Sequence, residues 1–220
     1  MIAAVVNAFR VPDLRKKILY TAFLLFIYRL GSFIPVPGVD ASRVVAEFER
    51  AAGAAGAGLL SLLDMFAGGA LSRFTVFALN VGPYITASIV MELLKVVIPQ
   101  LEELAKEGVE GRKKISQYTR YLTIVLAVVQ GYAYTLMLSG AVRPGALSRV
   151  LIVVSMTAGT AFVMWLGEKI SEHGIGNGIS LIIFTGIAAR IPSGVERTVK
   201  LIFAGGANLV MLQLCDKKSP

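Results

Sequence analysis

Long apolar segments constrain this chain more than any other feature of its sequence. A helix needs roughly 20 mostly apolar residues to cross a hydrocarbon core of about 30 Å, and four segments meet that requirement. Only 16% of the 220 residues are charged, below the usual quarter of a soluble domain, and 55% are hydrophobic. The four segments are Ile18–Val36, Phe74–Ile98, Tyr121–Val142 and Leu147–Gly167. We therefore predict an all-α membrane protein, a multi-span helical bundle, and regard a soluble enzyme as nearly excluded.

Two shorter apolar runs follow these segments. Ile179–Ile191 becomes a fifth span, residues 178–192, when its Gly-rich approach completes it. Leu201–Leu214 would reach only about 21 Å as a helix, which is too short for a bilayer core. We expect residues 1–195 to form one unit and residues 196–220 to be a truncated or divergent start of a sixth helix.

The positions of Lys and Arg predict the orientation of the spans. Arg15–Lys17 precede the first segment, which is longer than the apolar part of a signal peptide and is followed by no small-residue cleavage site. We therefore expect a retained span. More basic residues lie inside if the N-terminus is cytoplasmic, and the dense clusters Arg15–Lys17 and Arg112–Lys114 both fall there. A cytoplasmic N-terminus is favoured.

The loop expected over Pro99–Tyr121 holds a mixture of charges. Its basic residues include Arg112, Lys113, Lys114 and Arg120, and four glutamates are interleaved with them. Interleaved signs weaken any assignment to nucleic-acid binding. Two interpretations remain open, namely control of membrane topology and docking of a cytosolic partner.

Two features interrupt the apolar spans. Arg29 is the twelfth of nineteen residues in the first segment, where a charge costs about 2.5–3.5 kcal/mol, so it should face a protein interior or a wet cavity. It is either a structural contact between helices or a residue of a pathway. Gly82 and Pro83 lie about a third of the way along the second segment, where proline predicts a kink or break.

A short apolar helix is expected between the first and second spans. Its apolar residues are Leu59, Leu60, Leu62, Leu63, Met65 and Phe66. Eight helical residues reach only about 12 Å, so this helix cannot span. Two positions fit it equally: the outer surface of the membrane, or a re-entrant half-helix that lines a cavity.

The sequence carries no motif for catalysis or metal binding. One Cys and one His are too few for a Cys/His zinc site. Gly174–Gly178 is rich in glycine but follows a helix, and no Gly-Lys-Ser/Thr comes after it, as a phosphate-binding loop requires. We expect no enzyme, no cofactor and no metal.

Five strings of the sequence together carry a specific resemblance. They are Tyr28–Gly38, Asp64–Arg73, Phe77–Ser88, Glu107–Arg120 and Trp165–Phe184. In order and spacing they resemble the SecY family, which forms the central subunit of the bacterial protein-conducting channel. The resemblance covers about residues 10–195 and implies the N-terminal half, helices one to five, of a two-halved channel with ten helices. Glu92 departs from the uncharged polar residue expected there.

The resemblance implies roles for individual residues. Residues 59–70 match the plug, a short re-entrant helix that closes the pore from outside. Val81, Ile85 and Ile183 match an apolar ring that seals the constriction, and the second span matches one wall of the lateral gate. A ring of β-branched side chains can seal by dewetting and, making no specific hydrogen bonds, can admit any sequence. Arg29 then becomes an interior structural contact.

The resemblance also implies a function, partners and a location. The channel moves unfolded secretory chains across the plasma (inner) membrane and apolar segments into it, as a multi-pass protein. The implied partners are small membrane subunits of the SecE and SecG type, the SecA motor or the ribosome, the secretory polypeptide and the lipid bilayer, with no nucleic acid as substrate. The alternative is a half-repeat of a secondary small-molecule transporter, in which inverted halves and broken helices also occur.

Overall fold

The fold consists of helices, as the apolar segments predict. The computed structural model describes residues 11–39, 43–44, 46, 64, 68–137, 140, 142, 145–192, 195–196 and 199–200. Its helices are α2 (Pro12–Gly31), α5 (Gly82–Val97), α6 (Pro99–Lys106), α7 (Val109–Met137), α8 (Ala146–His173) and α9 (Gly178–Ala188). Within these ranges the β-type pairings are two isolated bridges, Pro35 with Thr75 and Val39 with Val142. The all-α prediction is confirmed.

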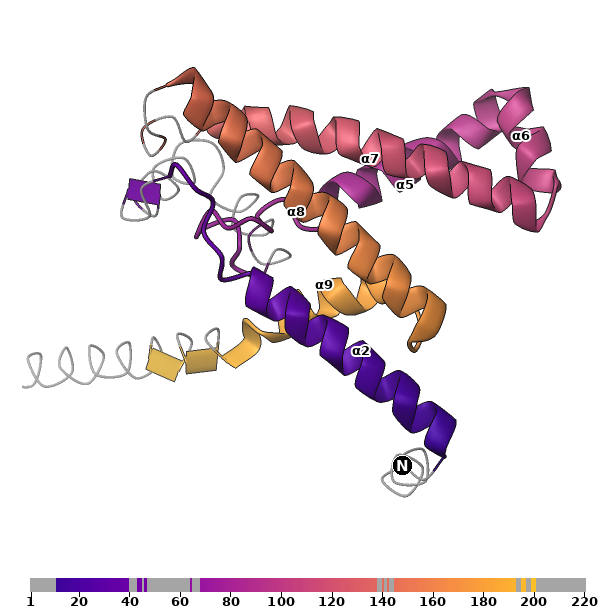
Figure 1. Cartoon of the computed structure of the whole chain (residues 1–220), viewed down its shortest axis with the longest axis horizontal. Helices are drawn as coiled ribbons and strands as arrows, with labels where there is room; N and C mark the ends of the chain where they lie inside the picture. The colour runs from indigo at the N-terminus through magenta and orange to yellow at the C-terminus, as the bar shows by residue number, and fades with distance from the viewer. Residues whose placement is uncertain are drawn as a thin grey trace, which may run out of the picture.

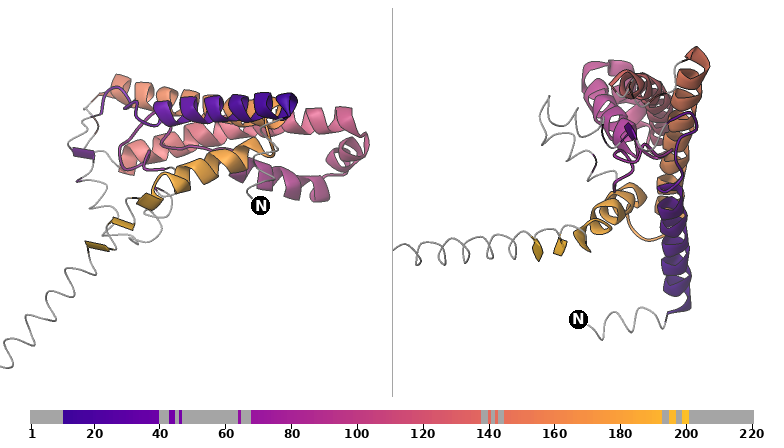
Figure 2. Two further views of the ribbon diagram at one scale, coloured as in Figure 1. Left: turned by 90° about the horizontal axis from the view of Figure 1, so that it is seen from below. Right: turned by 90° about the vertical axis from the view of Figure 1, so that its left-hand side faces the viewer.

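Helix α8 is the central packing element. It packs against α7, α9 and α2 (Figure 1). Helix α5 packs against α7. Helix α6 turns by 102° from α5 and leads back into α7. The start of α2, the end of α8 and the α6–α7 turn consequently lie at the same end of the molecule, as both Figure 1 and the left view of Figure 2 show.

Length and composition distinguish the helices as candidate membrane spans. Among the described residues, α8 alone is long and apolar enough to cross a membrane, and the bent pair of α5 and α6 passes the same test only when the two are counted together. Helix α2 includes Arg15–Lys17 and Arg29, and α7 includes Arg112–Lys114, so charged residues lower the apolar character of both helices.

The first helix is displaced from the predicted range of residues 18–36. Helix α2 begins at Pro12, where a proline is favourable because its missing N–H is not needed in the first turn. It ends at Gly31, residues 32–33 form a turn, and the Val36 N–H then donates to the Phe74 carbonyl at 3.1 Å. Because Pro35 cannot continue an α-helix, the prediction of helix up to Val36 is wrong.

The second apolar segment is helical only in its later part. Helix α5 begins at Gly82 instead of Phe74, and Pro83 lies in its first turn. Residues 74–81 run through successive turns, and Phe74 and Asn80 have φ values of 50°. The structure therefore has a break at Gly82–Pro83, one of the two expectations for this pair, and the expectation of a helix from Phe74 onward is corrected because α5 begins at Gly82.

The turn segment of residues 74–81 can lie within the membrane because other parts of the protein surround it. The ring of Phe77 stacks between Tyr28 of α2 and Phe162 of α8, with centroid distances of 6.0 Å to each. Backbone that is not helical is tolerated inside a membrane where it is buried in protein. Gly159 of α8 allows this packing, because a Cβ there would lie 2.1 Å from the carbonyl oxygen of Val76.

We expect the Gly159→Ala variant to be destabilised by about 1–3 kcal/mol, the usual effect of overpacking a dense interior. The added methyl group would meet a backbone oxygen, which can move only if the whole turn segment moves. Gly82→Ala is the matched control, because no atom lies within 4 Å of a Cβ built there. Thermal unfolding in one detergent checks the prediction. Equal midpoints for Gly159→Ala and the unchanged chain would contradict it.

The charged stretch of residues 99–121 is helical, although the sequence predicts a loop. It forms α6 and the first turns of α7, so Arg112, Lys113, Lys114 and Arg120 all lie on a helix. Arg120 pairs with Glu168 of α8 at 2.7 Å between Nε and Oε1, which ties this extension to its neighbour. Gly111 lies against the carbonyl of Leu104, so α6 also packs closely on α7.

The last two helices also differ in length from the predicted spans. Helix α8 continues past Gly167 to His173, and α9 ends at Ala188 instead of reaching residue 192. The side chain of Asn177 caps α9 by accepting hydrogen bonds from the N–H groups of Ile179 and Ser180 at 3.0 and 3.2 Å. Of the predicted start of a sixth helix, residues 201–220 lie outside the described residues.

Candidate functional site

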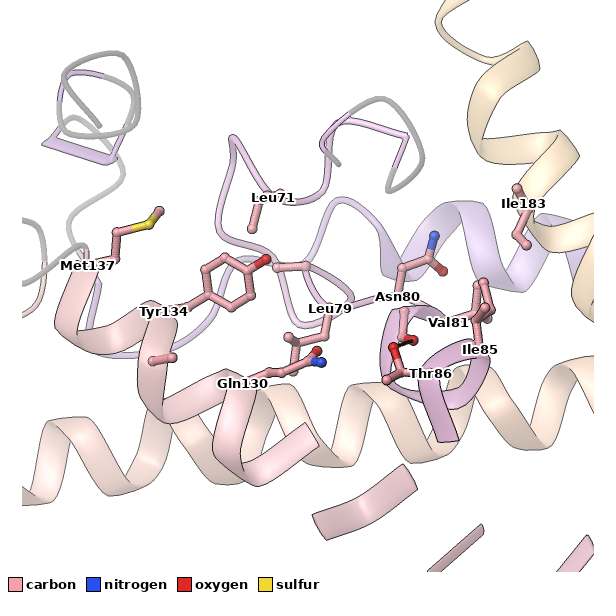
Figure 3. Close-up of a pocket in the computed structure, with 13 residues that line it drawn as sticks. Leu71, Leu79, Asn80, Val81, Ile85, Thr86, Gln130, Tyr134, Met137 and Ile183 are labelled. Atoms are coloured by element: carbon pink, nitrogen blue, oxygen red, sulfur yellow. Dashed lines mark hydrogen bonds between the residues drawn. The ribbon is translucent and has the colours of Figure 1, made fainter. Parts of the chain in front are cut away.

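The three residues of the expected ring meet at one cavity. Val81 ends the turn segment, Ile85 lies one turn into α5, and Ile183 comes from α9, far away in the sequence. All three line a cavity of about 600 Å³ (Figure 3). The other lining residues are Leu71, Ala78, Leu79, Asn80, Gly82, Thr86, Gln130, Ala133, Tyr134 and Met137. The fold therefore assembles a mainly apolar wall from α5, α7, α9 and the turn segment.

The cavity offers little for specific chemistry. The described residues that line it carry no charge, so they supply no acid–base pair and no anchor for an ionic substrate. The Thr86 hydroxyl donates to the Gly82 carbonyl of its own helix at 3.2 Å. What remains is a mainly apolar wall, with the side chains of Asn80, Thr86, Gln130 and Tyr134 as its polar groups.

The three ring residues differ in exposure. Val81 is 3% exposed, Ile85 is 39% exposed and Ile183 is partly buried. Val81 is fixed by the core that contains Phe77 and by the hydrogen bond from the Ile85 N–H to its carbonyl at 3.0 Å. Of the residues expected to form the ring, Val81 is therefore buried, whereas Ile85 is exposed near the start of α5.

Arg29 lies in the last turn of α2 and is half-buried. Its Nη1 donates to the carbonyl of Gly68 at 3.4 Å. The guanidinium also lies 5.2 Å from the centre of the Phe33 ring, and Arg73 lies 5.4 Å from that ring. Of the two roles that the sequence leaves open, these contacts favour the structural one, although the partner is the loop at Gly68 instead of another helix.

Of the segment expected to form the plug, the structure describes Asp64 and residues 68–70. Leu59, Leu60, Leu62, Leu63, Met65 and Phe66 all lie outside the described residues. Asp64 is described and is buried, with an ion pair to Arg190 that follows α9. The N–H of Ser72 donates to Oδ1 of Asp64 at 2.8 Å. The Asp64 carboxylate therefore connects Ser72, which precedes the turn segment, with Arg190, which follows α9.

The expected cytosolic residues occupy one end of the molecule. Arg112–Lys114 follow the α6–α7 turn, at the same end as Arg15–Lys17 of α2 (Figure 1). A hydrogen bond from Lys106, together with its charge, lowers the pKa of the Glu102 carboxyl on α6 below its usual value. Glu102 therefore stays ionised, and this end of the molecule presents both signs of charge.

Some residues of this region are absent from the sequence-based prediction. Gln130 and Tyr134 of α7 line the cavity, and Arg190 pairs with Asp64. Gln130 has a detectable signal, because it is the one amide side chain in the apolar segment Tyr121–Val142. The Asp64–Arg190 pair leaves no signal in the sequence, since more than a hundred residues separate its partners.

Comparison with known proteins identifies the family. The SecY family model matches residues 75–215. The protein translocase subunit SecY of Streptomyces coelicolor is 49% identical over 210 residues, which cover 88% of this chain and 47% of the relative. The chain belongs to the SecY family. The SecY subunit of Thermotoga maritima is 47% identical over 212 residues, covering 93% of this chain and 48% of that protein. The chain thus spans about half the length of these relatives.

Solved structures show the same fold. Sec61 in the canine ribosome–channel complex from the endoplasmic reticulum has a TM-score of 0.60 at 20% identity, covering 86% of this chain and 41% of that one. A SecY structure whose plug domain is described as stabilising the closed translocation channel has a TM-score of 0.58 at 23% identity, with coverage of 86% and 40%. The resemblance to SecY is confirmed, and the alternative of a small-molecule transporter repeat finds no support in these relatives.

Proposed function

We propose that this chain forms the N-terminal, pore-lining half of a passive protein-conducting channel in the plasma membrane. In this function it helps unfolded secretory chains to cross the membrane and apolar segments to enter it. The observation that carries the proposal is the convergence of Val81, Ile85 and Ile183 on one apolar cavity. The proposal includes no catalysis, cofactor or metal.

The chemistry of the cavity suits a channel for polypeptides better than a site for one small molecule. A transporter site needs several convergent polar or ionisable groups to recognise its substrate. The described wall here is mainly apolar, with the amides of Asn80 and Gln130 and the hydroxyls of Thr86 and Tyr134 as its polar side-chain groups. Such a wall tolerates every side chain of a passing polypeptide because it demands no particular hydrogen bond.

We place the N-terminus, the α6–α7 turn and the end of α8 on the cytosolic side. The two dense basic clusters, Arg15–Lys17 and Arg112–Lys114, support this orientation, because they lie at the same end of the helices (Figure 1). Lys and Arg are retained on the cytosolic side of membrane proteins. Arg112, Lys113, Lys114 and Arg120 would then serve both to orient the chain and to present a docking surface.

The partners follow from this arrangement. We propose that a second, C-terminal half completes the pore and that small SecE- and SecG-type subunits bind around the two halves. SecA or the ribosome would dock at the cytosolic end, near the α6–α7 turn. The secretory polypeptide and the lipid bilayer are the remaining partners, and nucleic acid is not a substrate.

A stalled secretory chain should crosslink to the ring. With the second half supplied, cysteine replaces Val81 or Ile85, and a thiol placed in a stalled secretory chain is tested for disulfide formation with each. Val96→Cys, near the end of α5 and 83% exposed, is the matched control because it lies outside the cavity. We expect adducts at residues 81 and 85 that far exceed those at residue 96.

The crosslinking experiment also separates the two functional classes. A small-molecule transporter would form no adduct with a stalled secretory chain at either ring position. Equal yields at residues 81, 85 and 96 would refute the placement of the pore at this cavity, since Val96 shares the helix but not the cavity.

A further inference from the structure

A polar contact connects two segments that carry opposite sides of the ring. Asp64 has a side chain only 5% exposed, and its carboxylate pairs with the guanidinium of Arg190. The other carboxylate oxygen accepts the N–H of Ser72 at 2.8 Å, and the Asp64 carbonyl accepts the N–H of Gly69 at 2.9 Å. Asp64 is therefore bonded both to the segment that leads toward Val81 and to the residue that follows α9.

Close backbone packing accompanies the ion pair. A Cβ on Gly68 would lie 3.1 Å from the Cα of Gly186 in α9, and a Cβ on Gly69 would lie 2.6 Å from Nη2 of Arg190. Both glycines have positive φ values, 64° and 88°. On the other side, Arg29 of α2 donates to the Gly68 carbonyl. The Gly68–Gly69 backbone is thus held between α2 and α9.

The geometry of α9 links this contact to the ring. Ile183 and Arg190 are seven residues apart, which places them on one helical face about two turns from each other. The Arg190 N–H still donates to the carbonyl of Ile187 at 3.0 Å, so the helical turn extends to this residue. Gly186 lies between them on the same face and contacts Gly68.

We propose that the Asp64–Arg190 pair is a positioning contact that keeps the Val81 side of the ring against the Ile183 side. This inference rests on the proposed channel function. Removing the charge of Arg190 leaves a buried carboxylate without its cation, which is strongly unfavourable. Residues 68–81 would then shift toward solvent, and the ring would loosen.

The test uses the full-length channel in planar bilayers, with all other cysteines, Cys215 included, replaced by serine. We expect Arg190→Cys to raise the closed-state ion conductance several-fold. Because the Arg190 side chain is 34% exposed, reagents can reach this position. Treatment with 2-aminoethyl methanethiosulfonate forms a disulfide, releases methanesulfinate and restores a cation, so the conductance should fall. Methyl methanethiosulfonate attaches a neutral group and should leave the leak unchanged.

Lys169→Cys, treated in the same way, is the matched control. The Lys169 side chain is 33% exposed and also pairs with a carboxylate, Glu172 at 2.7 Å, but both residues belong to α8 and neither lines the cavity. We expect its closed-state conductance to equal that of the unchanged channel before and after both reagents. A leak equal to that of Arg190→Cys would show that any lost ion pair has this effect and would overturn the proposal.

A second pair of variants serves if Arg190→Cys does not assemble. Asp64→Asn keeps the shape of the side chain and its acceptor for the Ser72 N–H, and we expect the closed channel with this substitution to leak. The channel that combines Asp64→Asn with Arg190→Gln should leak no more than a channel with either substitution alone. The reason is that the same interaction is removed in all three variants. Additive leaks would overturn the proposal, as would sealing of Arg190→Cys by the neutral reagent. If the channel with polar ring residues leaks but the channels with substitutions at residues 64 and 190 do not, the proposed channel function stands and this inference fails.

Discussion

Polar substitution of the whole ring should turn the closed channel into an ion leak. The variant combines Val81→Thr, Ile85→Asn and Ile183→Asn in the full-length channel. Each change replaces an apolar surface of the cavity with one that holds water, so the dewetted barrier is lost. We expect the closed-state conductance in planar bilayers to rise by at least an order of magnitude, because a continuous water path replaces a dry constriction.

The control for this prediction keeps the ring apolar. Val81→Ile, Ile85→Val and Ile183→Val change the shape of all three side chains but not their polarity. This variant should conduct no more than the unchanged channel when closed. An unchanged conductance in the polar variant would refute the seal, while equal leaks in both variants would show that packing, and not dewetting, closes the pore.

Export should be restored by this chain only when a C-terminal half is supplied with it. The chain covers 47% of its Streptomyces coelicolor relative, and all the described walls of the cavity come from α5, α7, α9 and residues 71–82. Large apolar side chains on other faces are exposed, Phe23 and Phe26 of α2 at 60% each and Leu93 of α5 at 63%. We therefore expect one half alone to insert in the membrane without enclosing a path for a polypeptide.

The measurement is complementation in a strain depleted of its own channel. The chain is expressed alone, together with a separate C-terminal half from the same source, or with that half and the polar ring variant. Growth and cleavage of a secreted reporter are followed. Rescue by the chain alone would refute the prediction, whereas the absence of rescue by both halves, with both present in the membrane, would argue against the proposed function.

The resemblance to the SecY family grouped Val81, Ile85 and Ile183, which the apolar pattern could not do. No periodicity connects Ile183 with Val81, and only the fold brings them to the wall of one cavity. Arg29 could be recognised as an interior residue from the sequence because a charge at depth is unfavourable, but its partner, the Gly68 carbonyl, could not. The Asp64–Arg190 pair was equally beyond reach, since side chains distant in sequence meet only after the helices have packed.

By itself the sequence determined that the chain is an all-α membrane protein and that its second apolar segment kinks or breaks at Gly82–Pro83. These conclusions depend on local quantities, the length of apolar segments and the conformational limits of proline. Only the tertiary structure decided that residues 74–81 are not helical and that the charged residues 109–120 are. Helix propensities differ by less than about 1 kcal/mol per residue for residues other than proline, whereas burying one large apolar side chain contributes about 1.5–3 kcal/mol. Stacking Phe77 between Tyr28 and Phe162 therefore outweighs the local preference of its segment.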